Sequence, residues 1–467
     1  MAPQTAQRLP LLGCSQGVAD PAADVIAWRG TRAVTRHGFL KDVLDVARQL
    51  PDHAHVINIC NDSYLFLVGF AAAVTRGQVT LMPPSRVPGV VVAIAEDYPD
   101  CYLLVDANTA DGALPQFRIS VDAAAKASPG EPLLFPRDVP TLAHDQLAAV
   151  LFTSGSTGKA VPNPKHWGTL VHGATATAGA LLAGIGAANV VSTVPPQHMY
   201  GFETTMLLPL LGFCRLQCER PLFPDDVRKT LELTAEPRVL ITTPVHLRTF
   251  TEFSGPMPAV TGIVSATAPL SPQLAEASEA RFRARLIEVF GSTETGVTAT
   301  RRTARDEPWQ LIDLFDIEAR QDGTRVRARH FRDDVLLQDV VRLEGSRQFR
   351  LIGRSSDLIN IAGKRASLGD LNAKLLAIDG VRDGVIFMPA VTGGDEADGT
   401  VHRTAALVVA PGMTREAILS ALRQVVDPAF LPRPLLLVDA LPRSETSKLP
   451  RAALLDLFAR HARDMEA

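Results

Sequence analysis

The sequence has 467 residues, of which 46% are hydrophobic and 21% are charged, and its formal net charge at pH 7 is −3. A chain of this length exceeds one ordinary hydrophobic core, so we expect at least two domains. The charge balance is that of an ordinary soluble protein, and it argues against nucleic acid or an anionic membrane surface as the main partner.

The cysteines and the apolar runs bear on the compartment. The five cysteines are scattered and odd in number, which predicts buried or partly buried free thiols in a reducing compartment. Leu11 to Cys14 is similar to a lipoprotein cleavage site, but the apolar segment before it has about four residues, where a signal needs roughly 7–15. The longest other apolar run, Tyr64 to Val74, is shorter than the ~20 residues that span a bilayer. We therefore expect a cytoplasmic protein without a membrane span.

From residue 39 onward, segments with helical and with strand-like hydrophobic spacing alternate along the sequence. We predict helices at 39–50, 63–75, 167–184, 202–211 and 271–283, and strands at 55–60, 78–82, 101–105, 147–150, 190–194, 238–243, 260–265 and 285–290. This alternation implies crossover connections, so the predicted fold is α/β, with mainly parallel sheets covered by helices. Ligands of such sheets bind in the loops at the strand ends. Residues 106–146, rich in Pro, Asp and Ala, are expected to form a connection.

The pattern changes near residues 310–350. There, short charged segments such as Arg325 to Arg329 predict small antiparallel strands with a solvated arginine face. Beyond Gly353 we predict a smaller unit, with helices at 367–378, 414–426 and from about 450, and strands at 384–388 and 403–409. The predicted organisation is a large N-terminal domain, residues 1–353, followed by a small, mobile C-terminal α+β domain, residues 354–467.

The segment that follows the predicted strand at 147–150 combines two glycines with hydroxyl side chains in Thr153 to Gly158. Glycine backbone N–H groups, hydroxyls and the charges of Lys159 and Lys165 together suit a phosphate. A Ser/Thr/Gly surface turn is the alternative. A Walker loop is excluded because only Ser156 and Thr157 separate the glycines, and a hydrolase elbow is excluded because Ser154 stands where that elbow needs glycine.

The hexapeptide Thr153-Ser154-Gly155-Ser156-Thr157-Gly158, followed by Pro164-Lys165, resembles the phosphate loop of the adenylate-forming (AMP-binding) superfamily. That superfamily includes acyl- and aryl-CoA synthetases, adenylation domains of peptide synthetases, and luciferases. The resemblance implies that these loop residues and Lys165 bind ATP. The family has one residue between the last glycine and Pro-Lys, whereas Lys159 to Asn163 intervene here. We therefore expect a longer loop, and which lysine meets the pyrophosphate end of ATP stays open.

A second segment, Phe290-Gly291-Ser292-Thr293-Glu294, is similar to the family's Tyr-Gly-x-Thr-Glu. Phe290 offers a π face for adenine, although it lacks the hydroxyl of the usual tyrosine. Thr293 can hydrogen-bond the α-phosphate, and Glu294 is a hard oxygen ligand for Mg²⁺. Alone, Glu294 would fit an acid at a helix N-terminus. Together with the phosphate loop, a metal ligand becomes the better interpretation.

Two further segments resemble the walls of the family's substrate pocket. Two prolines and a glycine in residues 195–201 predict a rigid loop after a strand, which would place His198 at a strand end. A structural histidine is the alternative, whereas the resemblance implies that His198 borders the acyl substrate. The segment that follows the strand at 260–265 is similar to a small-residue segment along adenine and the substrate, which implies this role for Thr267 and Ala268.

The remaining matches lie toward the C-terminus. Asp339 falls where the family has Thr-Gly-Asp, whose Asp binds the ribose hydroxyls, although Leu-Gln precedes Asp339 here. Arg354 begins a segment similar to the family's hinge, Gly-Arg-x-x-Asp-x-Ile-x-x-x-Gly-x-Arg, which implies nucleotide binding by Arg354. In the same segment Ser356 stands at the usual hinge Asp or Lys. Gly363 and Arg365 complete the spacing, and the segment around Gly363 would face the site when the thiol enters.

Leu441 to Leu449 resembles the family's C-terminal loop, with Lys448 as the lysine that joins the carboxylate and α-phosphate oxygens. A solvated charge is the alternative for Lys448. With ATP, Mg²⁺ and these residues, the resemblance implies an AMP-forming acid–thiol ligase. The enzyme would convert a small carboxylic acid into an acyl-adenylate and pyrophosphate, and pass the acyl group to CoA or to the phosphopantetheine arm of a separate acyl carrier protein.

The sequence leaves the substrate and the exact activity open. We favour an aryl acid such as a hydroxybenzoate, in a stand-alone ligase of secondary metabolism, over a fatty acyl-CoA or acyl-carrier-protein ligase. A non-catalytic nucleotide-binding relative that acts as an accessory subunit is the alternative from another class, prompted by the longer loop and by Ser356. Oxidation of the adenylate, as in luciferases, is a third possibility. The oligomeric state stays open.

Overall fold

The structure is a computed structural model that describes residues 7–15, 24–107, 114–121, 137–154, 160–320, 322–354, 357–361, 364–389, 403–443 and 449–466. Several predicted site residues lie outside these ranges, namely Gly155, Ser156, Thr157, Gly158, Ser356, Gly363 and Lys448. For Ser154 and Arg365 the structure describes the backbone alone.

The first sheet has the strand order β10-β9-β5-β4-β6-β7, and all of its pairings except β10 with β9 are parallel. Alternate residues of a strand point to opposite faces. Helix α2 accordingly packs on Val56 and Leu104 on one face, and helix α3 packs on Ile57 and Leu103 on the other. The elements are β4 (His55–Asn58), α2 (Ser63–Thr75), β5 (Val79–Met82), α3 (Pro88–Asp97), β6 (Cys101–Val105), β7 (Gln116–Arg118), β9 (Leu147–Ser154) and β10 (Ala160–His166).

The second sheet has the order β21-β22-β17-β16-β15-β14-β13-β11-β12-β2-β3, and it is parallel from β15 to β2. Its strands are β2 (Val25–Arg29), β3 (Arg32–Thr35), β11 (Ala188–Ser192), β12 (Cys214–Gln217), β13 (Arg238–Thr242), β14 (Gly262–Ser265), β15 (Leu286–Ser292), β16 (Gly296–Arg301), β17 (Trp309–Leu311), β21 (Asp339–Leu343) and β22 (Gln348–Arg354).

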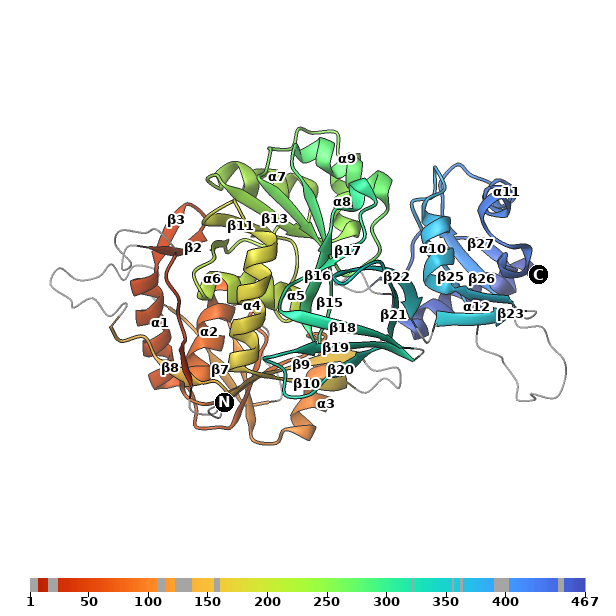
Figure 1. Ribbon diagram of the computed structural model, residues 1–467. Helices are drawn as coiled ribbons and strands as arrows, with labels where there is room; N and C mark the ends of the chain where they lie inside the picture. The colour runs from red at the N-terminus through yellow and green to blue at the C-terminus, as the bar shows by residue number, and fades with distance from the viewer. Residues whose placement is uncertain are drawn as a thin grey trace.

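Helices cover both faces of the second sheet (Figure 1). On one face lie α7 (Pro224–Leu233), α8 (Pro244–Glu252) and α9 (Pro272–Phe282). On the other face, α4 (Trp167–Leu181) and the helical segment from α5 (Met199–Gly201) to α6 (Leu208–Leu210) share one hydrophobic core with α1 (Arg36–Gln49), α2 and the first sheet. The prediction of an α/β fold with mainly parallel sheets is therefore confirmed.

Antiparallel structure follows the parallel strands, as the sequence predicted. Strands β18 (Phe315–Arg320), β19 (Gly323–Ala328) and β20 (Val335–Leu337) form a separate sheet. Arg327 on β19 is exposed and pairs with Glu318 and Asp334 at 2.9 Å each, which fits the predicted solvated arginine face. At the edge of the first sheet's lobe, β1 (Arg8–Pro10) pairs with β8 (Thr141–Ala143).

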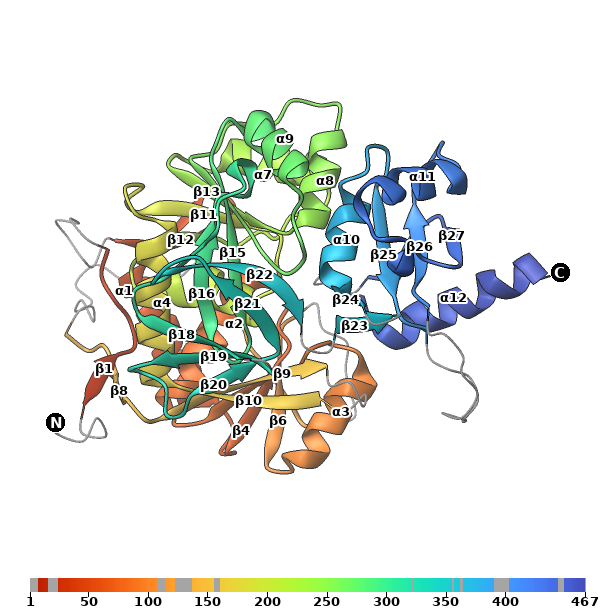
Figure 2. The ribbon, with the colours of Figure 1, turned by 45° about the vertical axis from the view of Figure 1, so that its right-hand side comes forward.

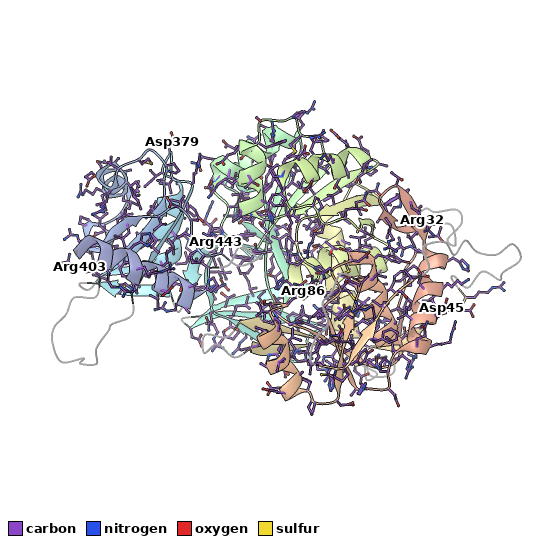
Figure 3. All side chains as sticks on the ribbon, turned by 180° about the vertical axis from the view of Figure 1, so that it is seen from behind. Arg32, Asp45, Arg86, Asp379, Arg403 and Arg443 are labelled. Atoms are coloured by element: carbon purple, nitrogen blue, oxygen red, sulfur yellow. The ribbon has the colours of Figure 1, made fainter. Side chains whose placement is uncertain are left out.

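The residues after Arg354 form a smaller body beside the large one (Figures 1 and 2). It contains β23 (Leu358–Ile361), β24 (Lys364–Ser367), α10 (Leu368–Leu376), β25 (Asp383–Phe387), β26 (Ala405–Val409), α11 (Arg415–Val425), β27 (Leu435–Leu437) and α12 (Arg451–Glu466). Its two hydrophobic clusters are built from residues 359 onward, whereas the other clusters end at residue 349. Arg443, labelled in Figure 3, lies on the side of this body that faces the large one.

Some expectations need correction. Helices α3, α7 and α8 were not predicted. Each begins with a proline, a residue that in a sequence indicates a loop but that also suits the first turn of a helix. Cys14 is exposed, in contrast to the buried or partly buried thiols expected, while the other four cysteines are covered at least in part and all five are free. In the part of the chain that the structure describes, every helix is too short or too polar to cross a lipid bilayer.

Candidate active site

The predicted phosphate loop connects two paired strands. Ala160 to Asn163, which the sequence suggested as part of a longer loop, instead pair with Ser154 to Leu151 in an antiparallel hairpin. The prolines at 162 and 164 are compatible with this pairing because β10 is the edge strand of its sheet, where a missing N–H group need not break a ladder. The extra residues therefore lengthen the hairpin, and Thr153 stands opposite Val161 close to its end.

Lys165 lies inside the molecule rather than at the end of the hairpin. Its side chain is only 4% exposed, and its Nζ donates a hydrogen bond to the Glu294 carbonyl oxygen at 2.7 Å. Burial lowers the pKa of the Lys165 ammonium to about 8, although the carboxylates of Glu294 and Glu203 act in the opposite direction. The structure thus joins two predicted site residues, Lys165 and Glu294, that are far apart in the sequence.

Glu294 belongs to a tight turn between β15 and β16. The Ser292 hydroxyl accepts a hydrogen bond from the Thr295 N–H at 3.2 Å, and the Thr295 hydroxyl accepts one from the Ser292 N–H at 3.3 Å. Gly296 closes the turn with a φ of 72°, a left-handed conformation that favours glycine. Gly291, at the start of this hairpin, pairs with Val297. The turn leaves Thr293 half-buried and Glu294 exposed.

The donor set of this turn fits Mg²⁺. Glu294 carries the exposed carboxylate of the turn, and the described residues contain no group of three His, Cys, Asp or Glu side chains that could hold a metal. Mg²⁺ is commonly bound through one or two carboxylates, with substrate phosphates and water as its other ligands. A metal that depends on protein ligands alone would not fit here.

Glu203 was not predicted from the sequence, and it supports the same turn. It lies in the π-helix Phe202–Leu207, where one carboxylate oxygen accepts a hydrogen bond from the Thr177 hydroxyl at 2.6 Å. The other oxygen accepts one from the Val297 N–H at 3.1 Å. The side chain is 1% exposed, and this burial raises the pKa of the Glu203 carboxyl. A single acid within the apolar run from Phe202 to Leu211 was the signal that could have identified it.

The loop that carries His198 is held by contacts on several sides. A Cβ atom on Gly201 would come 2.1 Å from the Pro195 carbonyl oxygen, so the loop folds tightly on itself. Arg86, labelled in Figure 3, donates to the Cys60 carbonyl at 2.8 Å and to the Gln197 side-chain oxygen at 3.2 Å. Arg86 therefore connects the loops of the first sheet to the segment just before His198. His198 itself is half-buried.

Tyr200 and Thr267 meet the carboxyl ends of the central strands. The Tyr200 hydroxyl donates to the Val264 carbonyl oxygen, 3.0 Å away, at the end of β14. Thr267, three residues farther on, has a φ of 83°, which is rare for a residue other than glycine. Its hydroxyl oxygen is buried and has no hydrogen-bond partner among the described residues. Ala268 follows and is half-buried. Such backbone strain is often stored at functional sites.

The predicted nucleotide residues form two smaller groups. The half-buried Phe290 ring has its centroid 5.5 Å from those of Trp309 and Phe349. Asp339 and Arg354 pair directly across β21 and β22, with the Arg354 Nε 3.5 Å from the Asp339 Oδ1. Burial raises the pKa of Asp339, and the Arg354 guanidinium opposes that shift. The predicted ribose ligand and the first hinge residue are therefore neighbours.

Comparison with known proteins gives three related findings. A family model described as AMP-binding enzyme matches residues 33–314. The 4-coumarate–CoA ligase of Rhodobacter capsulatus is 31% identical over 236 residues, which cover 50% of this chain and 58% of the ligase. The probable non-canonical nonribosomal peptide synthetase CymA of Salinispora arenicola is 27% identical over 402 residues, which cover 76% of this chain and 5% of the synthetase.

Among solved structures, that of the anthranilate CoA ligase AuaEII in complex with anthranoyl-AMP superposes with a TM-score of 0.77. The superposition covers 98% of this chain and 99% of that chain, at 14% sequence identity. At this identity the likeness shows a shared fold. It extends through both the large and the small body described above.

Proposed function

The chain belongs to the AMP-binding enzymes of the adenylate-forming superfamily, and from this premise we propose that it activates a carboxylic acid with ATP and transfers it to a thiol. The first step would yield an acyl-adenylate and pyrophosphate, and the second a thioester and AMP. The observation that carries the proposal is the Lys165–Glu294 contact of 2.7 Å. It brings the phosphate-loop hairpin against the turn that carries Thr293 and Glu294.

The proposed mechanism begins with charge. A carboxylate that approaches a triphosphate needs donors and positive charge around the reacting oxygens, because like charges repel. The hairpin end around Thr153 would cradle the phosphates, and Thr293 would donate its hydroxyl to the α-phosphate. Glu294 would hold Mg²⁺, which when bound neutralises phosphate charge. Lys448 would join the carboxylate and the α-phosphate oxygens.

The nucleotide and the acid would occupy neighbouring parts of this site. Asp339 would bind the ribose hydroxyls and Phe290 would face adenine, with Arg354 at the edge of the nucleotide site. His198 and Thr267 would border the acid. An aryl acid is the favoured substrate class, supported by the names of the coumarate and anthranilate ligases that resemble this chain. The similarity to a peptide synthetase supports a carrier-protein thiol as an acceptor besides CoA.

Thioester formation would require the small body to move. We place the domain boundary at Gly353–Arg354, so that the body would rotate about Ser356 and bring Gly363 and Arg365 to the site. One ion pair that the described residues make across the boundary is weak: Arg382 Nε lies 4.0 Å from a carboxylate oxygen of Glu252, and both side chains are more than half exposed. A pair of this kind contributes little to stability, so it would not oppose rotation.

The decisive experiment measures pyrophosphate release with ATP and Mg²⁺ against a panel of aryl, short-chain and long-chain acids. Acid-dependent release would support adenylation and identify the acid class. The Lys448→Ala variant should lose this release while it still binds ATP. A folded protein that binds ATP but releases no pyrophosphate with any acid would instead favour a non-catalytic accessory subunit. An adenylate that forms no thioester with CoA or a carrier thiol would favour oxidation.

A further inference from the structure

We propose that Lys165 and Glu203 are positioning residues, which hold the Thr293–Glu294 turn from its two ends and do not contact the nucleotide. This inference rests on the proposed function, because it assigns a purpose to the turn. It also removes Lys165 as a candidate for the pyrophosphate contact, for which the sequence left the choice of lysine open. The argument depends on where the hairpin places Lys165 and on what the two side chains bind.

The register of the hairpin places Lys165 away from the phosphate loop. Val161 stands opposite Thr153, and Lys165 stands opposite Ala149. Four residues of extended strand correspond to about 13 Å. Measured along the hairpin, the Lys165 backbone therefore lies that far from Thr153, on the side away from the phosphate loop. A lysine on an edge strand could extend into solvent. Here the side chain turns inward instead and ends on the Glu294 carbonyl oxygen.

Glu203 holds the opposite end of the turn. Its carboxylate accepts a hydrogen bond from the N–H of Val297, the first residue after Gly296. A Cβ atom on Gly296 would lie 3.0 Å from the nearer Glu203 oxygen, so the turn and the carboxylate are in close contact. Because Thr177 on α4 donates to the other oxygen, the carboxylate is itself fixed in orientation. The turn is therefore bound through its backbone on both sides.

Backbone anchoring leaves the Glu294 side chain available for a ligand. Lys165 uses the carbonyl of Glu294, so the Glu294 carboxylate remains exposed. Both anchors are also buried, and each lies in the electrostatic field of the other. Replacing either side chain leaves a partner group, the Glu294 carbonyl or the Thr177 hydroxyl, without its hydrogen bond, and an unsatisfied buried group costs more than the bond itself contributes. We expect the two residues to act as a unit.

The test compares ATP with AMP, because AMP lacks the phosphates that a pyrophosphate ligand would bind. Calorimetric titration of wild type, Lys165→Met and Glu203→Gln with each nucleotide in Mg²⁺ would measure affinity without turnover. If the two residues position the turn, both variants should lose AMP affinity between about threefold and tenfold, because Thr293 would bind the α-phosphate that AMP keeps. They should lose ATP affinity by at least that factor, because the turn also carries Glu294, the proposed Mg²⁺ ligand. The matched controls are Lys229→Met and Glu232→Gln, which alter ion pairs on the exposed face of α7.

A loss of ATP affinity of tenfold or more in Lys165→Met, with AMP affinity unchanged, would overturn the proposal in favour of direct phosphate binding. Unchanged affinities for both nucleotides in both variants would overturn it as well. Amide hydrogen exchange of residues 290–298 provides a second measurement. If Lys165 and Glu203 hold the turn, these amides should exchange faster in either variant, and unchanged exchange would refute the proposal. If Lys165→Met does not fold, Glu203→Gln, which keeps the shape of the side chain, decides. A wild-type protein that binds no ATP would refute the proposed function and the inference together.

Discussion

Acidification should destabilise the protein through His330, a buried histidine in the connection between β19 and β20. Its side chain is 5% exposed, and neither ring nitrogen has a hydrogen-bond partner among the described residues. The His172 ring lies 6.3 Å away, and the His144 ring lies 5.5 Å from that of His172. Burial lowers the pKa of His330 to about 4, and the nearby His172, Lys165 and His144 act in the same direction.

The sign follows from comparing the two states. Above pH 7, His330 is neutral whether the chain is folded or unfolded, so it adds no pH dependence. Below the ordinary pKa of about 6.5 the unfolded chain binds a proton that the folded chain does not, and stability falls. A shift from about 6.5 to about 4 predicts a loss of about 2 kcal/mol by pH 5 and about 3 kcal/mol by pH 4.

Urea unfolding of wild type and His330→Phe at pH 7.5 and pH 5 measures this contribution. The aromatic neighbours Phe315 and Phe331 should accommodate the new ring. We expect the wild type to lose about 2 kcal/mol more than the variant between these two pH values. His461→Phe, on α12 and outside this cluster, should keep the wild-type profile. Parallel profiles for wild type and His330→Phe would refute the reasoning, because they would mean that His330 titrates alike in both states.

Three further substitutions and one control test the site. Thr267→Gly should raise the free energy of unfolding by up to about 1 kcal/mol, since it relieves a left-handed φ. Ala268→Gly should lower that energy, and equal effects in urea unfolding would contradict the strain. Phe290→Ala should lower the free energy of unfolding by about 2 kcal/mol, since it removes two ring–ring contacts, and should raise the KM for ATP but not for the acid. Asp339→Asn should raise the KM for ATP about tenfold in the pyrophosphate assay, as the loss of a charge-assisted hydrogen bond predicts. An unchanged KM would remove Asp339 from the ribose site.

The fold was predictable where the sequence signals are local. Helix α2 was predicted with its correct bounds, because the apolar run from Ser63 to Thr75 follows Asp62, whose side chain accepts the Leu65 N–H as an N-cap. Helix α7 was missed although it is amphipathic, because Pro221, Pro224 and two aspartates around its start suggest a turn. The physical signal was present in both segments, but only in α2 did composition and periodicity agree.

The candidate site was predictable to the extent that its geometry is local. The Thr293–Glu294 turn is built from contacts within Ser292 to Gly296, so its short motif contains most of its structure. The contacts that fix this turn to the rest of the molecule join residues 129 and 94 positions apart. No periodicity or spacing rule encodes such distances, since they depend on which strands become neighbours in the sheet. Glu203 could be suspected as a buried acid, but its partner could not.

The hairpin shows how one missing fact about topology changes the function assigned to a residue. Prolines at 162 and 164 normally indicate a loop, and they are compatible with a strand here only because β10 lies at the edge of its sheet. The sequence does not reveal which strand is an edge strand, so Lys165 was expected at the end of a long loop. The register shows that Lys165 contacts the turn of Glu294. In the sequence, the lysine next to the glycines of the phosphate loop is Lys159. Of the two lysines that the sequence leaves as candidates for the pyrophosphate contact, the proposed positioning role therefore removes Lys165 and leaves Lys159.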